Sequence, residues 1–183
     1  MRALGKRLLK ALGLAAAGYL VFAFFAPSSY RIERSKKIGA SPEIIYEQLA
    51  FFENWENWSP WKEKDPSLKY SYQGETGFTD AVCIWDGDEK LSGSGSRVIT
   101  DVNENSQVRY SQTYDEREMD SDGGFSIIEG EFTTEVRWFV EWDVPFLFRP
   151  IAALNDLESQ MIPDLERGLE RLDSVAELKQ EEY

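Results

Sequence analysis

Residues 133–172, TTEVRWFVEWDVPFLFRPIAALNDLESQMIPDLERGLERL, carry a strand pattern followed closely by a helix pattern. Apolar residues alternate with charged ones in the first part, which predicts a strand over residues 133–144. Its apolar face would hold Val136, Trp138, Val140, Trp142 and Val144. Apolar residues then recur at intervals of three and four between 150 and 172, which predicts a long helix with one apolar stripe. Because Pro163 removes a backbone donor within that stripe, we expect a bend near Ile162.

The chain before residue 133 also has the period-two pattern of strands, interrupted by residues that favour turns. Turns are expected at 74–77, 86–88, 103–105 and 120–124. The strands expected there are 69–73, 79–85, 91–102, 107–114 and 125–129, with another at 30–38. Neighbouring strands joined without helices should pair antiparallel through hairpins. A short helix is expected to begin at Pro42 and to end near Phe52.

One long helix is left to cover this sheet of six to seven strands. A helix is ~10 Å wide, about two strand spacings of ~4.8 Å, so it cannot cover a flat sheet of that size. We therefore expect an α+β fold in which a curved antiparallel sheet wraps around the C-terminal helix. The curvature should leave a tapering space lined by inward aromatic and aliphatic side chains, and this space is the candidate binding site.

Residues 55–66, WENWSPWKEKDP, contain three tryptophans and two prolines. Tryptophan combines a large apolar area with one N–H donor, so such a cluster suits either the core or the rim of an apolar pocket. We expect Trp55, Trp58 and Trp61 to form a rigid aromatic lip, with core packing as the alternative for each of them.

The N-terminus carries a hydrophobic stretch long enough for a membrane anchor. Residues 11–26 contain no charge, and Leu8 and Leu9 extend the apolar run beyond Lys10. At about 1.5 Å per residue the run approaches the ~30 Å hydrocarbon core of a bilayer. We expect residues 1–27 to be a single transmembrane anchor, with a cleaved signal peptide or a buried core helix as alternatives. Basic residues flank both ends, and we favour a cytoplasmic N-terminus with the domain outside the cell membrane.

The composition excludes several kinds of catalytic site. Histidine is absent, which rules out His-dependent triads, imidazole bases and His-ligated zinc. The single cysteine, Cys83, can form no internal disulfide, and its apolar neighbours indicate a buried, inert thiol. The net charge is −13, or −17 without the four basic residues of the N-terminal tip, so nucleic-acid binding is disfavoured. We expect no cofactor and no metal site.

Several motifs together resemble bacterial polyketide-cyclase-like proteins of the START/Bet v 1 helix-grip (SRPBCC) superfamily, some of which also have an N-terminal anchor. The resemblance covers residues 30–172. It rests on Trp58-Ser59-Pro60-Trp61 with Asp65-Pro66, Cys83-Ile84-Trp85-Asp86-Gly87, Gly93-Ser94-Gly95-Ser96, Thr134-Glu135-Val136-Arg137-Trp138 and Asp164-Leu165-Glu166-Arg167-Gly168-Leu169-Glu170-Arg171-Leu172. It implies a hydrophobic-ligand cavity between the sheet and the long helix, and it implies no particular reaction.

The function expected from these features is a membrane-anchored binding or carrier domain for a lipid-like or polycyclic hydrophobic small molecule. The candidate ligand-binding residues are Trp55, Trp58, Trp61, Trp85, Tyr110, Phe125, Trp138, Trp142 and Met161. The ligand-binding domain would span residues 28–175, followed by a charged tail over 176–183. Residues after Leu172 are expected to fray.

Two alternatives belong to other classes of function. The first is a cyclase or dehydratase, in which a carboxylate with a raised pKa, or a tyrosine, would transfer protons. The tyrosines considered are Tyr70, Tyr72, Tyr110 and Tyr114. The second is an acidic protein-interaction module with a filled core, which would contact a basic partner through residues 115–122. That segment lacks the ligand spacing of an EF-hand, so we interpret it as a solvated hairpin tip.

Overall fold

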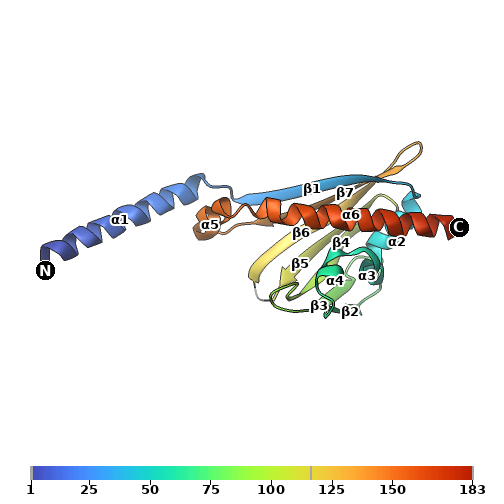
Figure 1. The fold of residues 1–183 in the computed structure, drawn as a ribbon, viewed down its shortest axis with the longest axis horizontal. Coiled ribbons are helices and arrows are strands. Elements are labelled where there is room, and N and C mark those ends of the chain that lie inside the picture. Colours follow the sequence, from blue (N-terminus) through green and yellow to red (C-terminus); the bar gives the residue numbers. More distant parts are fainter. Residues whose placement is uncertain (1, 116, 183) are drawn as a thin grey trace.

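In the computed structural model, which describes residues 2–115 and 117–182, seven antiparallel strands form one curved sheet, and the long helix α6 (Leu157–Glu182) crosses one face of it (Figure 1). The strand order is β1-β7-β6-β5-β4-β3-β2. The strands are β1 (Ser29–Ile38), β2 (Lys69–Gln73), β3 (Val82–Asp86), β4 (Ser94–Asn103), β5 (Gln107–Tyr114), β6 (Arg117–Glu129) and β7 (Thr134–Asp143). The predicted α+β architecture, with a sheet wrapped around a C-terminal helix, is confirmed.

Strand β7 has the two faces that its sequence predicts. Val136, Trp138, Val140 and Trp142 are all buried on the side that faces the helices. Phe139 points to the opposite side and is buried as well, because the Arg31 guanidinium lies 3.9 Å from the centre of its ring. A cation over an aromatic face is electrostatically favourable and also shields the ring from water.

The prediction of a turn at residues 120–124 was wrong, because these residues lie within β6. Gly123 pairs with Tyr110 in the sheet, and a Cβ at Gly123 would lie 2.3 Å from the Tyr110 ring. The glycines here make room for aromatic rings and do not form a turn. The hairpin lies instead between Tyr114 and Arg117, and Glu116 of the predicted tip lies outside the described residues.

The C-terminal helix differs from its prediction in two respects. A break at Asp156, which has a φ of 38°, separates it from the short helix α5 (Arg149–Leu154), whereas a single helix was predicted over residues 150–172. Pro163 lies inside α6, near its N-terminal end, where a missing N–H removes a single helical hydrogen bond. The helix also continues to Glu182 and does not fray after Leu172: Ala176 is fully buried, and the Gln180 side chain accepts a 2.8 Å hydrogen bond from the backbone of Ser41.

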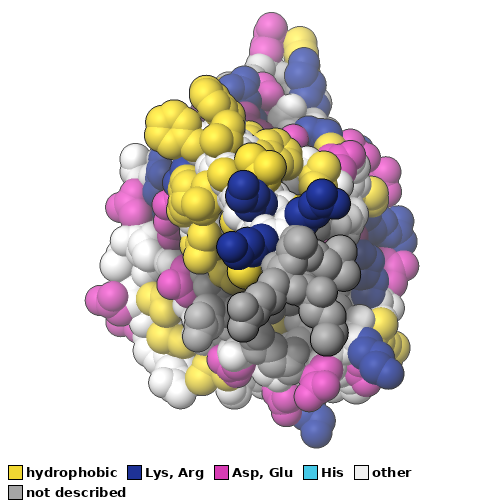
Figure 2. Space-filling model, turned by 90° about the vertical axis from the view of Figure 1, so that its left-hand side faces the viewer, with side chains coloured by type: hydrophobic (Ala, Val, Ile, Leu, Met, Phe, Trp, Pro, Cys, Tyr) yellow, Lys and Arg dark blue, Asp and Glu magenta, His cyan; other side chains and the backbone are white. Residues whose placement is uncertain are grey.

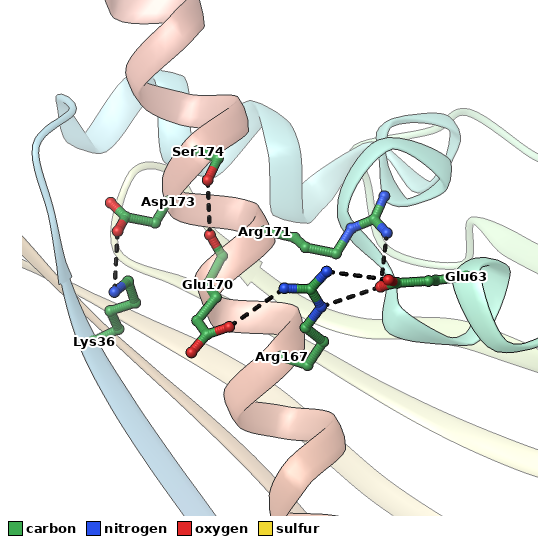
Figure 3. Close-up of polar contacts among 7 residues, drawn as sticks. All are labelled: Lys36, Glu63, Arg167, Glu170, Arg171, Asp173 and Ser174. Carbon is green, nitrogen blue, oxygen red and sulfur yellow. Dashed lines mark hydrogen bonds and ion pairs between the residues drawn. The ribbon is translucent and has the colours of Figure 1, made fainter.

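Four short helical segments lie between β1 and β2, namely α2 (Pro42–Ala50), η1 (Phe52–Asn54), α3 (Trp55–Trp58) and α4 (Pro60–Lys64). Three of them, α2, α3 and α4, pack against α6. Charged side chains connect them to α6 (Figure 3): Glu63 accepts hydrogen bonds from Arg167 and Arg171, and Arg171 also binds the carbonyl of Asn57. On the other side of α6, Lys36 of β1 pairs with Asp173 at 3.1 Å. These ion pairs are exposed or only partly buried, so they orient α6 but are individually weak.

Helix α1 (Arg2–Phe25) extends away from the sheet (Figure 1). Its segment Gly5–Phe25 is long and apolar enough to cross a membrane, and nearly all of it is exposed. Its C-terminal part packs against η2 (Phe146–Phe148) and α5. There the Tyr19 hydroxyl donates a hydrogen bond to the carbonyl of Leu147.

Candidate functional site

The tryptophan-rich segment forms α3 and α4, and two of its three tryptophans lie in the core and not in a lip. Trp55 is 3% exposed and Trp58 is fully buried. Their indole N–H groups donate to the carbonyls of Leu49 and Gln48, at 2.9 and 3.0 Å. Carbonyls in the last turn of a helix have no partner within that helix, so these two rings close the end of α2 and gain the partner that a buried indole needs.

An aromatic cluster fills the central space between α6 and the sheet. Its members are Trp55, Trp58, Tyr110, Phe125 and Trp138, each at most 3% exposed. Trp138 stands edge-on to Trp58, at 5.7 Å between ring centres, and donates a 3.0 Å hydrogen bond to the Tyr110 hydroxyl. The tapering cavity expected here is therefore occupied by the protein's own rings, since five large side chains supply the volume that one helix leaves open.

A smaller pocket of about 200 Å³ remains beside this cluster, between the first turns of α6 and strands β2 to β4. Three of the nine predicted ligand-binding residues, Trp61, Trp85 and Met161, line it. The remaining lining residues are Ser59, Leu68, Tyr70, Glu89, Leu91, Ser92, Gly93, Ser94, Arg97, Tyr114 and Asp164. The candidate site thus lies at one end of the predicted cavity.

Arg97 lies at the inner wall of this pocket and is only 7% exposed. Its guanidinium carbon lies 4.3 Å from the ring centre of Trp55, 4.8 Å from that of Tyr110 and 5.5 Å from that of Trp85. Nε and Nη2 both donate to the Gln112 side-chain oxygen, at 3.1 and 2.8 Å. Among the described residues, no carboxylate forms an ion pair with Arg97, so its charge is stabilised only by aromatic faces and one neutral amide oxygen and is not neutralised.

Asp65 fixes the loop that forms the rim of the pocket. The carboxylate is 1% exposed and accepts hydrogen bonds from the backbone N–H groups of Ser67 and Asp88, at 3.0 and 2.8 Å. The hydroxyls of Ser67 and Ser92 donate to it as well. These donors lower the pKa of Asp65 from 3.8 to about 2, with the hydroxyls of Ser67 and Ser92 as the largest causes. A permanently ionised carboxylate with four donors is suited to holding the rim in place and not to accepting protons.

The lowered pKa of Asp65 predicts that the stability of the protein decreases in acid. Because its folded-state pKa lies below the unfolded value near 4, its contribution to stability is present above pH 4 and lost as the pH falls toward 2. Asp65→Asn should be less stable than the wild type at pH 7, and the difference should shrink between pH 4 and pH 2. Denaturant unfolding of both proteins at several pH values measures this difference, and a constant difference over that range would contradict the assignment.

Three of the four tyrosines considered for catalysis, Tyr70, Tyr72 and Tyr110, are poorly suited to act as bases. Burial raises the pKa of Tyr70 to about 12 and also raises the pKa of Tyr110. The pKa of Tyr72 is raised by burial and by its 2.9 Å hydrogen bond to Glu56. Burial likewise raises the pKa of the Cys83 thiol to about 11, as expected for a structural cysteine.

Trp142 lies apart from the pocket. Its ring stacks on Tyr30 at 5.7 Å and lines a separate depression across β1, β7 and β6. That depression has a volume of about 850 Å³ and carries Asp120, Asp122 and Glu141. In the described part of the chain, no group of three or more His, Cys, Asp or Glu side chains is arranged to hold a metal ion.

The pocket and the anchor are at the same end of the sheet. β3 ends, β4 begins and β5 ends beside the pocket. Because each strand is antiparallel to its neighbour, this is also the end at which β1 begins, with Ser29, and β7 ends, with Asp143. Helix α1 leads into β1, so the pocket lies at the end of the sheet from which α1 extends.

Sequence reasoning missed Arg97 and Asp65, which hold the polar part of the site. Arg97 alternates with Gly95 and Ile99, and these three residues all point inward from β4. The period-two pattern therefore contained a signal, a charged residue on the apolar face. Gly95 makes room for the Trp85 ring that forms the pocket wall, because a Cβ at this position would lie 2.5 Å from that ring.

Comparisons with known proteins identify the fold. No protein-family model matches the chain, and no curated protein matches it by sequence. Among solved structures, ginseng major latex-like protein 151 from Panax ginseng superposes with a TM-score of 0.60 at 12% identity, over 82% of this chain and 99% of that one. The Aha1 dimer from Colwellia psychrerythraea gives 0.59 at 17% identity, over 80% and 96%.

The di-domain ARO/CYC protein StfQ from the steffimycin biosynthetic pathway gives a TM-score of 0.62 at 10% identity, over 83% of this chain. The matched region spans about half of StfQ, 52% of its length. These neighbours have Bet v 1-like and polyketide-cyclase-type folds, and the chain shares that fold.

Proposed function

We propose that this protein is a membrane-tethered binding domain for a small amphipathic molecule, which enters the pocket between Trp61, Trp85 and Met161 and places an anionic group against Arg97. The observation that carries the proposal is the buried Arg97 guanidinium, which has aromatic neighbours but no carboxylate partner among the described residues. A buried cation is costly to leave unpaired, so an incoming carboxylate or phosphate would gain a charge-assisted hydrogen bond there.

The other charges at the pocket are compatible with an anionic ligand. Glu89 is exposed at the rim, and Asp164 is neutralised by its ion pair with Lys64. The indole rings of Trp61 and Trp85, together with Met161, supply apolar walls of the pocket that also contains Arg97. A combination of apolar walls with one well-placed polar group is typical of small-molecule sites.

The volume of the pocket limits the size of what it encloses. Cavities that surround a drug-sized ligand measure roughly 300–1,000 Å³, whereas this pocket measures about 200 Å³. It therefore suits a small molecule or the charged end of a longer one, whose apolar part would extend past Leu91 and Met161. Leu91 is 60% exposed and available for that contact.

Residues 1–27 would hold the pocket close to the bilayer. Helix α1 has the length and composition of a membrane span, and its packing against η2 and α5 gives it a structural role that a cleaved signal peptide would lack. We place the basic N-terminus in the cytoplasm and residues 28–175 outside the cell membrane. The pocket would then lie at the bilayer end of the sheet, although strands β7, β6 and β5 separate β4 at the pocket from β1 at the anchor.

Binding of cis-parinaric acid and of its methyl ester tests the proposal. The wild-type protein should bind the acid at least about tenfold more tightly than the ester, since a charge-assisted hydrogen bond contributes about 1.5–3 kcal/mol. In Arg97→Met, which keeps the apolar volume, the two affinities should become equal. Fluorescence titration of the full-length protein in detergent measures both affinities.

Arg109→Met is the matched control, because Arg109 lies over Phe139 on the outer face of the sheet. It should leave the preference for the acid unchanged. The proposal fails if the wild-type protein binds neither ligand saturably, or if it binds both equally while Arg97→Met changes nothing.

A cyclase-type activity has less support from this site. Acid–base catalysis near neutral pH needs a group whose pKa lies close to the working pH. Asp65 is shifted toward lower values, and Tyr70, Tyr72 and Tyr110 toward higher ones. We therefore propose binding and not chemistry as the role of the pocket.

A further inference from the structure

The connection between β7 and α6 forms an apolar surface that the binding site does not use. Residues 144–154, VPFLFRPIAAL, contain no acid and a single base, Arg149, in a chain with 33 acidic residues. We call this segment the apolar shelf. Four of its large side chains are at least half exposed: Leu147 and Phe148 are each 59% exposed, Ile151 is 50% exposed and Leu154 is 76% exposed. An exposed apolar surface of this kind on a strongly acidic domain indicates an interaction site for an apolar partner.

The apolar shelf lies directly against α1. The Tyr19 hydroxyl donates a hydrogen bond to the carbonyl of Leu147, and α1 touches both η2 and α5. Ala23 of α1 is fully buried at this end of the helix. Seen from the anchor side, the molecule shows hydrophobic side chains gathered on this face (Figure 2). The shelf is thus continuous with the apolar surface of α1.

If α1 spans a membrane, the position of Tyr19 along the helix determines how deep the apolar shelf lies in the bilayer. If the bilayer ended at Tyr19, the segment from Gly5 to Tyr19 would cross only about 22 Å at 1.5 Å per residue, which is short of the ~30 Å hydrocarbon core. The span must therefore extend to Phe25, six residues farther and about 9 Å along the helix axis. Tyr19, and the Leu147 carbonyl bonded to it, then lie below the membrane surface.

Several backbone carbonyls of the apolar shelf have hydrogen-bond partners within the protein and do not depend on water. Three of its carbonyls accept hydrogen bonds from side chains: Val144 from Arg149 at 3.3 Å, Ile151 from Asn155 at 2.8 Å, and Leu147 from Tyr19. Most of the remaining backbone is helical, in η2 and α5. Unpaired carbonyls are costly in hydrocarbon, so this pairing suits a segment that enters lipid.

We infer that the apolar shelf inserts into the outer leaflet of the bilayer beside α1 and so forms a second point of membrane attachment. This inference rests on the proposed anchor role of α1 and not on the proposed ligand. Insertion of Phe148, Ile151 and Leu154 fixes how the domain is oriented on the membrane, which α1 alone, as a single connection, would leave free. The rest of the domain is acidic and is repelled by anionic headgroups, so the shelf is the face that turns toward the lipid.

Spin-label accessibility in phosphatidylcholine vesicles tests this insertion with the full-length chain. Single cysteines replace Phe148, Leu154, Phe132 or Leu14 in a Cys83→Ala background, and each is labelled with a nitroxide. Phe132 is the matched control, an 87% exposed apolar residue in the β6–β7 hairpin at the opposite end of the sheet. Leu14 reports whether α1 itself lies in the bilayer.

We expect the labels at 14, 148 and 154 to collide more with oxygen, which dissolves in lipid, and the label at 132 to collide more with a water-soluble nickel chelate. A lipid environment at 14 together with water at 148 and 154 would overturn the inserted shelf while leaving the anchor intact. Water at all four positions would overturn the anchor as well. Neither result bears on the affinity for parinaric acid, which is measured separately in detergent.

Discussion

Trp138→Ala should lower the free energy of unfolding by about 3–5 kcal/mol. The indole is fully buried at the centre of the aromatic cluster and contacts Trp58, Trp61 and Phe125. Its removal deletes those contacts and leaves a cavity under α6, and it also leaves the Tyr110 hydroxyl without the hydrogen bond from Nε1. The loss of a buried polar partner adds to the cavity.

Denaturant unfolding followed by circular dichroism measures this loss. Phe132→Ala is the control, since Phe132 is also aromatic but is 87% exposed, and it should change stability by less than about 0.5 kcal/mol. A loss below about 1 kcal/mol for Trp138→Ala would mean that the centre of the fold is looser than the structure shows, with room for a ligand where we describe packed rings.

Gly168→Ala should destabilise the protein by about 1–3 kcal/mol, although the same change in an exposed helix stabilises it by about 1 kcal/mol. A Cβ at Gly168 would lie 2.6 Å from the Trp138 ring and 3.3 Å from Pro60. The ring is held by the cluster and by its hydrogen bond to Tyr110, so it cannot move aside. The close approach of α6 to the sheet therefore requires a residue without a side chain.

Ser174→Ala provides the comparison within the same helix, because Ser174 is exposed and, among the described residues, its hydroxyl bonds only to the carbonyl of Glu170. It should be neutral or slightly stabilising. Urea midpoints of the two variants separate the effects of helix propensity and packing. If Gly168→Ala is as stable as the wild type or more so, α6 does not lie as close to Trp138 as described.

Much of the fold follows from patterns between neighbours in the chain. β2 and β5 lie at their predicted positions, and α2 begins at Pro42 as predicted. These elements depend on period-two or period-3.6 spacing, which the sequence displays directly. Two predictions were wrong where a residue contacts a partner far away in the sequence. Gly123, predicted to lie in a turn, makes room for the Tyr110 ring, and the end of α6, predicted to fray, contacts Gly39 and Ser41. No local pattern distinguishes such residues from turn or tail residues.

The candidate site shows the same division. Of the predicted ligand-binding residues, three line the pocket, namely Trp61, Trp85 and Met161. Five others fill the core, namely Trp55, Trp58, Tyr110, Phe125 and Trp138. Both groups consist of large apolar residues with the same sequence signature. The acceptors of the Trp55 and Trp58 indoles, the carbonyls of Leu49 and Gln48, become recognisable only once α2 and α3 are placed against each other.

The sequence alone determined the α+β architecture, the apolar face of β7, the absence of histidine chemistry and the acidic character of the domain. It did so because spacing and composition are properties of the chain itself. The tertiary structure alone decided how much of the space under α6 stays open and which charge faces it. The reason is that a cavity is the difference between the volume a sheet encloses and the volume its side chains fill, and residues far apart in sequence contribute to both.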